Sequence, residues 1–137
     1  MYGDTAAGRK RAAQLREQAG DVRALAARLV SQAEAVPWHG KAAEAMRERI
    51  RERASHLRTA AAQHDTAAES LTAHLTEVDR LKEAIEARSR KATTLVEDAR
   101  TRASEGAPAD DADAVLVAFD PPPSGHRDWL TVELPGL

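Results

Sequence analysis

The sequence contains no cysteine and only four aromatic residues among 137. Without cysteine there are no disulfides and no thiolate chemistry, and the redox compartment stays open. With so few aromatic residues and 31% charged residues, we do not expect a large α/β fold around a catalytic cleft. No run of about 18 apolar residues occurs, so we expect no membrane span. The first residues lead into charge rather than an apolar stretch, so we also expect no signal peptide.

Glycine and proline are both absent between Gly40 and Gly106. Since these residues interrupt helices, their absence predicts two long helices, Asp4–Val36 and Lys41–Ser104, on either side of one turn. A capping-box pattern at Thr66–Glu69 leaves open a fold-back of the second helix. Its unbroken seven-residue register favours a continuous helix instead.

Large apolar residues recur every seven positions in both segments, beside columns of alanine such as Ala12, Ala19 and Ala26. This period predicts a left-handed pair of helices, which alanine allows to approach closely. We therefore expect an all-α, antiparallel, coiled-coil-like helical hairpin that forms a four-helix bundle on dimerisation, with itself or with a different protein. The expected partner interface consists of Leu15, Val22, Leu29, Ile50, Leu57, Leu71, Val78 and Ile85.

The composition changes after residue 106, which divides the chain into a predicted hairpin domain, residues 1–106, and a tail, residues 107–137. The tail is acidic and contains proline. Alternating apolar residues in Val115–Phe119 and Trp129–Leu134 predict two short strands, whereas the composition alone favours a disordered tail. Because two strands are marginal alone, they would have to lie on the second helix and bury Trp129.

No group of residues has the spacing of an active site, so we expect no enzymatic activity and no cofactor. His56, His64 and His74 are too far apart in sequence to share a metal on a helix. His64 falls in the apolar column, where it either fixes the register or forms a pH-sensitive junction. A basic first half with interleaved glutamates and an acidic tail argue against nucleic acid as a partner.

The turn between the predicted helices contains Pro37, Trp38, His39 and Gly40. Proline stops the first helix, and Gly40 permits the reversal through a positive φ. A large ring in a polar, alanine-rich chain is expected to be buried, so we predict that Trp38 closes the end of the seam.

At these residues the chain resembles the WXG100 family, the small helical-hairpin substrates of type VII (ESX) secretion in actinobacteria and other Gram-positive bacteria. The resemblance covers roughly residues 5–85 and rests on Trp38-x-Gly40, the length of the first helix and the heptad columns. It implies a non-enzymatic secretion substrate or secretion chaperone, secreted or displayed on the cell surface. The implied partners are the chain itself, a second WxG-type protein or a larger toxin or secretion substrate, with a secretion ATPase as a further contact.

The chain departs from the family pattern in its longer second helix and its tail. The Tyr-x-x-x-Asp/Glu export signal of the family has no counterpart here, and the nearest pattern pairs Trp129 with Glu133 as a possible export signal. These departures leave open an alternative function as a cytoplasmic coiled-coil scaffold or adaptor that binds a partner protein.

Overall fold

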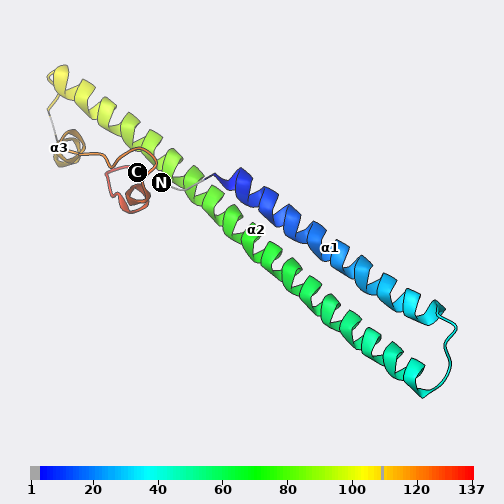
Figure 1. The fold of residues 1–137 in the computed structure, drawn as a ribbon. Coiled ribbons are helices and arrows are strands. Elements are labelled where there is room, and N and C mark those ends of the chain that lie inside the picture. Colours follow the sequence, from blue (N-terminus) through cyan, green and yellow to red (C-terminus); the bar gives the residue numbers. More distant parts are fainter. Residues whose placement is uncertain (1–3, 109) are drawn as a thin grey trace. The chain divides into compact units, whose positions relative to one another are not determined.

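The computed structural model describes residues 4–108 and 110–137, and it confirms the all-α helical hairpin (Figure 1). Its elements are α1 (Thr5–Ala35), α2 (Lys41–Ser104), α3 (Asp111–Val117) and a 3-10 helix, η1 (Arg127–Thr131). The described residues contain no strand. The long helix α2 is continuous, so the alternative fold-back near Thr66 does not occur.

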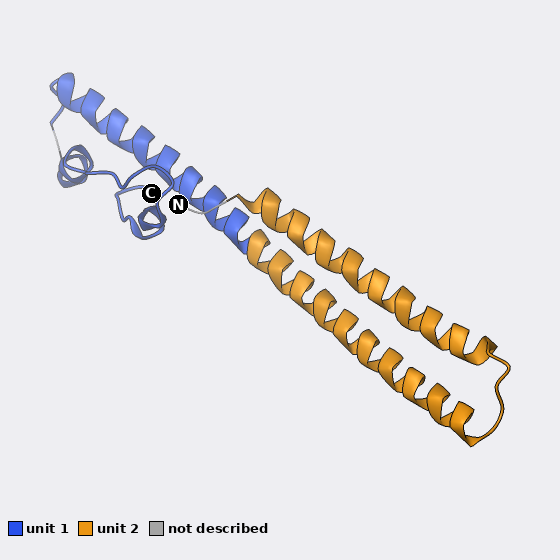
Figure 2. Cartoon of the chain, in the orientation of Figure 1, with its two compact units in different colours: residues 1–3, 77–137 blue, residues 4–76 orange. Residues whose placement is uncertain are grey.

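The chain divides into two compact units, of which one comprises residues 4–76 and the other contains residues 77–137 (Figure 2). The first, the hairpin unit, holds α1 and the beginning of α2. The second, the tail unit, holds the end of α2 with α3 and η1. The division falls inside α2, whereas the composition placed the expected domain boundary after residue 106. The difference arises because the tail packs on the last part of α2.

Local sequence sets both ends of α1. The carboxylate of Asp4 accepts a hydrogen bond from the backbone N–H of Ala6 at 2.9 Å and so caps the first turn. Pro37 follows the C-cap residue Val36, whose extended backbone leaves the helix. The observed helix Thr5–Ala35 therefore matches the predicted segment to within one residue at each end.

Alanine forms the seam of the hairpin unit, where α1 and α2 lie side by side (Figure 1). The alanines of these columns are at most 1% exposed. They are Ala12, Ala19 and Ala26 of α1 and Ala54, Ala61 and Ala68 of α2. Because a methyl group allows two helices to approach closely, the large apolar residues cannot fit between them and lie at the edge of the seam. Leu15, Val22 and Leu57 are accordingly only half-buried.

The tail forms helical turns, so the prediction of two strands is wrong. Asp110 caps α3 by accepting a hydrogen bond from the Asp113 N–H at 2.8 Å, and acidic residues occupy the first helical turn. Leu116 is 3% exposed while Val115 and Val117 are 50% and 41% exposed. The strand prediction expected Val115 and Val117 to face the core. In the helix the residue between them, Leu116, faces the core instead.

The tail is ordered against α2, which also contradicts the disordered alternative. Trp129 of η1 is 3% exposed and packs with Ile85 and Ala92 of α2. A neighbouring cluster joins Leu116 of α3 to Val96 and further α2 residues. Trp129 is thus buried on the second helix, as the docked alternative required, although by helical turns instead of strands.

The hairpin turn and the open apolar face

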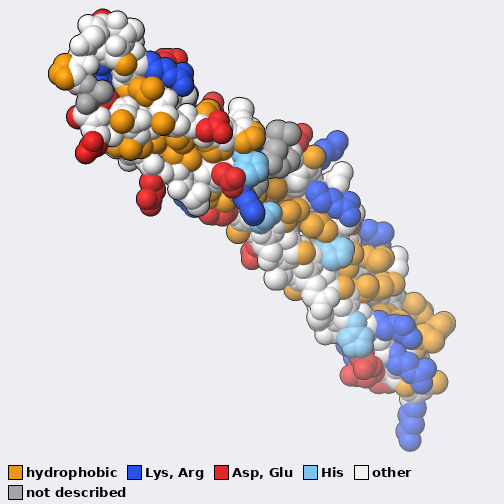
Figure 3. All heavy atoms as spheres, turned by 90° about the vertical axis from the view of Figure 1, so that its left-hand side faces the viewer, with side chains coloured by type: hydrophobic (Ala, Val, Ile, Leu, Met, Phe, Trp, Pro, Cys, Tyr) orange, Lys and Arg blue, Asp and Glu red, His pale blue; other side chains and the backbone are white. Residues whose placement is uncertain are grey.

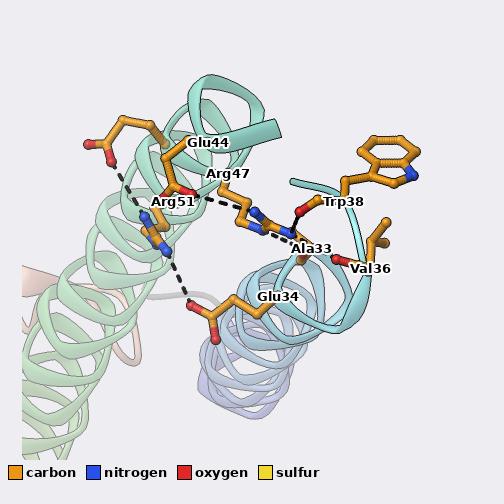
Figure 4. A network of polar contacts seen from close by, with 8 residues as sticks. Ala33, Glu34, Val36, Trp38, Glu44, Arg47 and Arg51 are labelled. Atoms are coloured by element: carbon orange, nitrogen blue, oxygen red, sulfur yellow. Dashed lines mark hydrogen bonds and ion pairs between the residues drawn. The ribbon is translucent and has the colours of Figure 1, made fainter. Parts of the chain in front are cut away.

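The guanidinium of Arg47 holds the turn together from the first part of α2 (Figure 4). Its Nη2 donates to the carbonyl oxygens of Val36 and Trp38, each at 2.8 Å, and its Nε donates to that of Ala33 at 3.3 Å. The last carbonyls of a helix have no partner within the helix and carry partial negative charge. No basic residue lies in the last turn of α1 itself. Arg47 therefore caps α1 from the opposite helix.

Gly40 supplies the reversal that the sequence predicted, with φ of +100°. Its carbonyl accepts the N–H of Glu44 at 3.1 Å, which starts α2. A Cβ added at this glycine would meet nothing within 4 Å, so only the backbone conformation selects glycine here.

Trp38 does not close the seam, and the prediction of a buried ring is wrong. The residue is 55% exposed. Arg47 fills the inside of the turn and binds the backbone carbonyl of Trp38, while the indole ring projects away from this network (Figure 4). The carbonyl groups at the end of α1 thus bind the Arg47 guanidinium. This side chain occupies the space that the sequence analysis predicted for the indole ring.

An apolar groove of about 230 Å³ lies beside the turn, between the end of α1 and the start of α2. Its lining comprises Leu29, Gln32, Ala33, Val36, Trp38, Ala43, Met46, Arg47 and Ile50. Met46 is 46% exposed and lies with Trp38 along this groove. The hairpin therefore presents exposed apolar side chains next to its turn.

The two sides of the hairpin differ in polarity. Successive residues of a helix are 100° apart around its axis. The residue three positions after a seam alanine therefore lies on one side of the alanine column, and the residue four positions after it lies on the other side. The four-position residues Arg16 and Arg23 bind across the seam to Thr72, at 3.2 Å, and to Asp65. This side of the hairpin is therefore polar and paired.

The three-position residues form the other side, which we call the open face. In an antiparallel pair the same offset on each helix falls on the same side of the hairpin. The open face contains six of the predicted interface residues together with two exposed neighbours: Leu15, Val22, Leu25, Leu29, Met46, Ile50, Leu57 and Leu71. None of the eight is fully buried. On the side drawn in Figure 3, Lys and Arg side chains lie among apolar ones near the turn.

The remaining two predicted interface residues, Val78 and Ile85, belong to the tail unit and are buried. Ile85 is 3% exposed and packs in the cluster that contains Trp129. The chain's own tail thus covers Ile85, where a partner was expected. Ile85 is a core residue and not, as predicted, part of the partner interface. The sequence pattern could not distinguish the two, because both coverings need the same apolar column.

The possible export signal at Trp129 and Glu133 is not an accessible aromatic–acid pair. The indole N–H of Trp129 donates to the Pro123 carbonyl at 3.1 Å, and its ring lies 6.1 Å from that of Phe119. Arg88 of α2 donates to the carbonyl oxygens of Trp129, at 2.9 Å, and Val132. Glu133 remains exposed. Core packing of the aromatic member therefore separates the two residues of the predicted signal.

A bidentate ion pair joins α3 to the end of α2. Arg102 Nη2 and Nε donate to Asp113 at 2.6 and 3.2 Å. The hydrogen bond from Arg102 lowers the pKa of the Asp113 carboxyl below the usual value for aspartate. The pair therefore favours the ionised, docked form of α3 at neutral pH.

No group of three or more metal-binding side chains comes together among the described residues. No helix within the described part of the chain is long and apolar enough to cross a bilayer. His64, three positions after the seam alanine Ala61, lies on the open-face side of α2. It is half-buried, and its enclosed Nδ1 atom has no hydrogen-bond partner among the described residues.

Sequence reasoning missed Arg47 and Arg88, the two arginines that hold the turn and the tail. In the sequence Arg47 is one of the basic residues interleaved with glutamates, which gave it no separate role. A signal was present, because Arg47 stands in the same seven-residue column as Ala54 and Ala61 and so must face α1. For Arg88 the signal was weaker, since its partners are backbone carbonyls more than forty residues away.

No protein-family model, curated protein or solved structure matches the chain. The likeness to WXG100 proteins thus rests on the sequence features described above.

Proposed function

We propose that the chain is a non-enzymatic type VII (ESX) secretion substrate or secretion chaperone that acts through helix–helix pairing. The observation that supports this most is the exposed Trp38 in the Trp-x-Gly turn of a two-helix hairpin. Arg47 and Gly40 hold the turn without the ring, so the tryptophan has no evident structural task. A large aromatic residue on the surface of a polar, alanine-rich hairpin favours recognition by another protein.

The open face supports the pairing part of this proposal. Apolar side chains at the edge of the seam lose contact with water only when another helix covers them, at about 25 cal/mol per Å² of buried area. The partner in this proposal is the chain itself, a second WxG-type protein or a larger toxin or secretion substrate, with a secretion ATPase as a further contact. The protein would then be found in the medium or at the cell surface.

A cytoplasmic scaffold or adaptor is the second candidate, and the buried Trp129 favours it. If the tail signal of the family must be accessible, a chain that packs its nearest equivalent into a core lacks that signal. Such a protein would use the same open face to hold a partner inside the cell.

Export of the Trp38→Ala variant tests the first candidate. We expect wild-type protein in the medium of its native host, none when the type VII ATPase is deleted, and a large loss for Trp38→Ala. The thermal stability of the variant should stay within about 0.5 kcal/mol of wild type, because the ring is mostly exposed. Val115→Ala, which removes an exposed apolar side chain outside the open face, is the matched control and should be exported normally.

Retention of the wild-type protein in cells that contain an active type VII system would contradict secretion and favour the scaffold. Equal export with and without the ATPase would contradict this route specifically.

A further inference from the structure

The tail unit shows how a partner covers the apolar column of α2. The tail brings two kinds of group to the helix: apolar side chains, including Leu116 and Trp129, and oxygen atoms that accept from arginine. Arg88 donates to two tail carbonyls, and Arg102 forms its bidentate pair with Asp113. Covering this column thus requires oxygen acceptors for the arginines beside it as well as apolar contact.

One further arginine of α2 shares the heptad position of Arg88 and Arg102 but has no such partner. Arg53, Arg88 and Arg102 are separated by whole heptads, so they occupy one seven-residue column of α2. Arg88 and Arg102 are paired by the tail, whereas Arg53 is exposed and forms no ion pair with the residues that the structure describes.

Further unpaired arginines border the open face. Arg11, Arg28 and Arg49 each lie three or four positions from a residue of this face, which places them beside it on the helix surface. They too are exposed and form no ion pair within the described part of the chain. Asp21 is the one acidic residue that lies three or four positions from a residue of the open face. By contrast, Arg23 and Arg51, on the polar side, pair with acidic residues of this chain.

We propose that the open face binds a different protein, a helical hairpin with an acidic rim, in preference to a second copy of this chain. In a two-fold dimer each surface patch meets its own copy, so a rim of arginines would meet arginines. Repeated like charges beside an apolar contact weaken it and select against that partner. A rim of Glu and Asp would instead supply to Arg11, Arg28, Arg49 and Arg53 the acceptors that the tail supplies to Arg88 and Arg102.

This inference rests on the proposed function in taking the open face as a pairing surface, and it adds the chemistry of the partner.

A charge-reversed copy of the chain serves as the probe, because it has the same apolar face with an acidic rim. The variant carries Arg28→Glu, Arg49→Glu and Arg53→Glu. The matched control reverses the same number of charges away from the open face, with Lys10→Glu, Lys41→Glu and Arg58→Glu. Circular dichroism first verifies that both variants are as helical as the full-length wild type, and sedimentation velocity then measures association.

We expect wild type to bind the rim variant about tenfold more tightly than it binds itself, and this preference to vanish at about 1 M salt. The control variant should bind wild type no better than wild type binds itself. Self-association of wild type should strengthen as salt rises, a measurement that needs no variant. The inference is overturned if wild-type self-association equals the mixed association, if the control binds as tightly as the rim variant, if wild-type self-association weakens with salt, or if no sample associates at about 100 μM.

These outcomes are independent of export. A chain that prefers the acidic-rim probe but never leaves the cell would contradict the proposed function and support this inference. A secreted chain that forms a tight homodimer would do the reverse.

Discussion

Arg47 holds the C-terminus of α1 from the opposite helix, and replacing it with alanine tests whether this contact stabilises the hairpin. The substitution removes hydrogen bonds to three carbonyl oxygens, those of Ala33, Val36 and Trp38. Alanine is the best helix former, so the change costs α2 nothing in propensity. Any loss of stability therefore reports the lost contacts.

The magnitude follows from the surroundings of each bond. The bonds to Ala33 and Val36 are partly buried, whereas the bond to Trp38 is exposed, so that water replaces it. Two partly buried bonds at about 1 kcal/mol each predict a loss of about 2 kcal/mol in the free energy of unfolding. A lysine at this position keeps the charge but lacks the planar fork, so Arg47→Lys should recover only part of the loss.

The control is Arg51→Ala, one turn further along α2. Arg51 makes two ion pairs at 3.5 and 3.6 Å with a side chain that is 44% exposed, so its removal should cost less than about 0.5 kcal/mol. Urea unfolding followed by circular dichroism measures both variants, and hydrogen exchange should locate the loss in the last turn of α1. If Arg47→Ala and Arg51→Ala unfold at the same urea concentration, the capping argument is wrong.

Other variants test the tail and the glycines. Trp129→Ala should destabilise the tail unit by about 3 kcal/mol and expose the tail to limited proteolysis, since a buried ring is lost; unchanged protection would contradict its core role. Gly20→Ala should stabilise by up to about 1 kcal/mol, because a Cβ there meets nothing within 4 Å in mid-helix, whereas Gly40→Ala should destabilise by about 1 kcal/mol through its positive φ. Similar melting temperatures for the two glycine variants would refute that contrast. The lowered pKa of Asp113 predicts a contribution to stability that is present above the ordinary aspartate pKa and is lost as pH falls through the lower folded value. Asp113→Asn should abolish this part of the acid transition, measured by pH titration of tail proteolysis; an identical titration would contradict it.

The hairpin could be predicted because its signals are local and repeated. Asp4 caps α1, Pro37 ends it, Gly40 reverses the chain, and the heptad columns continue through α2 without a break. Each of these depends on residues within about one turn, so the helix bounds followed from the printed sequence.

The candidate site was predicted only in part. The spacing placed Leu15, Val22 and Leu29 on one face, where the structure has them half-exposed. It could not show that Trp38 would be displaced from the seam, because the competitor for that space, Arg47, is nine residues away and belongs to the other helix. The glutamates interleaved with the arginines of α2 indicated pairing along that helix. They gave no reason to expect a contact between Arg47 and the end of α1.

The sequence by itself determined which segments are helical and that their apolar and alanine columns share one side of each helix, since periodic patterns act through near neighbours. Only the tertiary structure decided the form of the tail and the exposure of the turn. The apolar residues around Leu116 fit either a strand or a short helix, and the surface on which they pack decides between the two. That surface is α2. Its Arg88 binds the carbonyl oxygen of Trp129, 41 residues away along the chain. Contacts at that separation depend on the folded arrangement, because no local pattern specifies which apolar column the tail will cover.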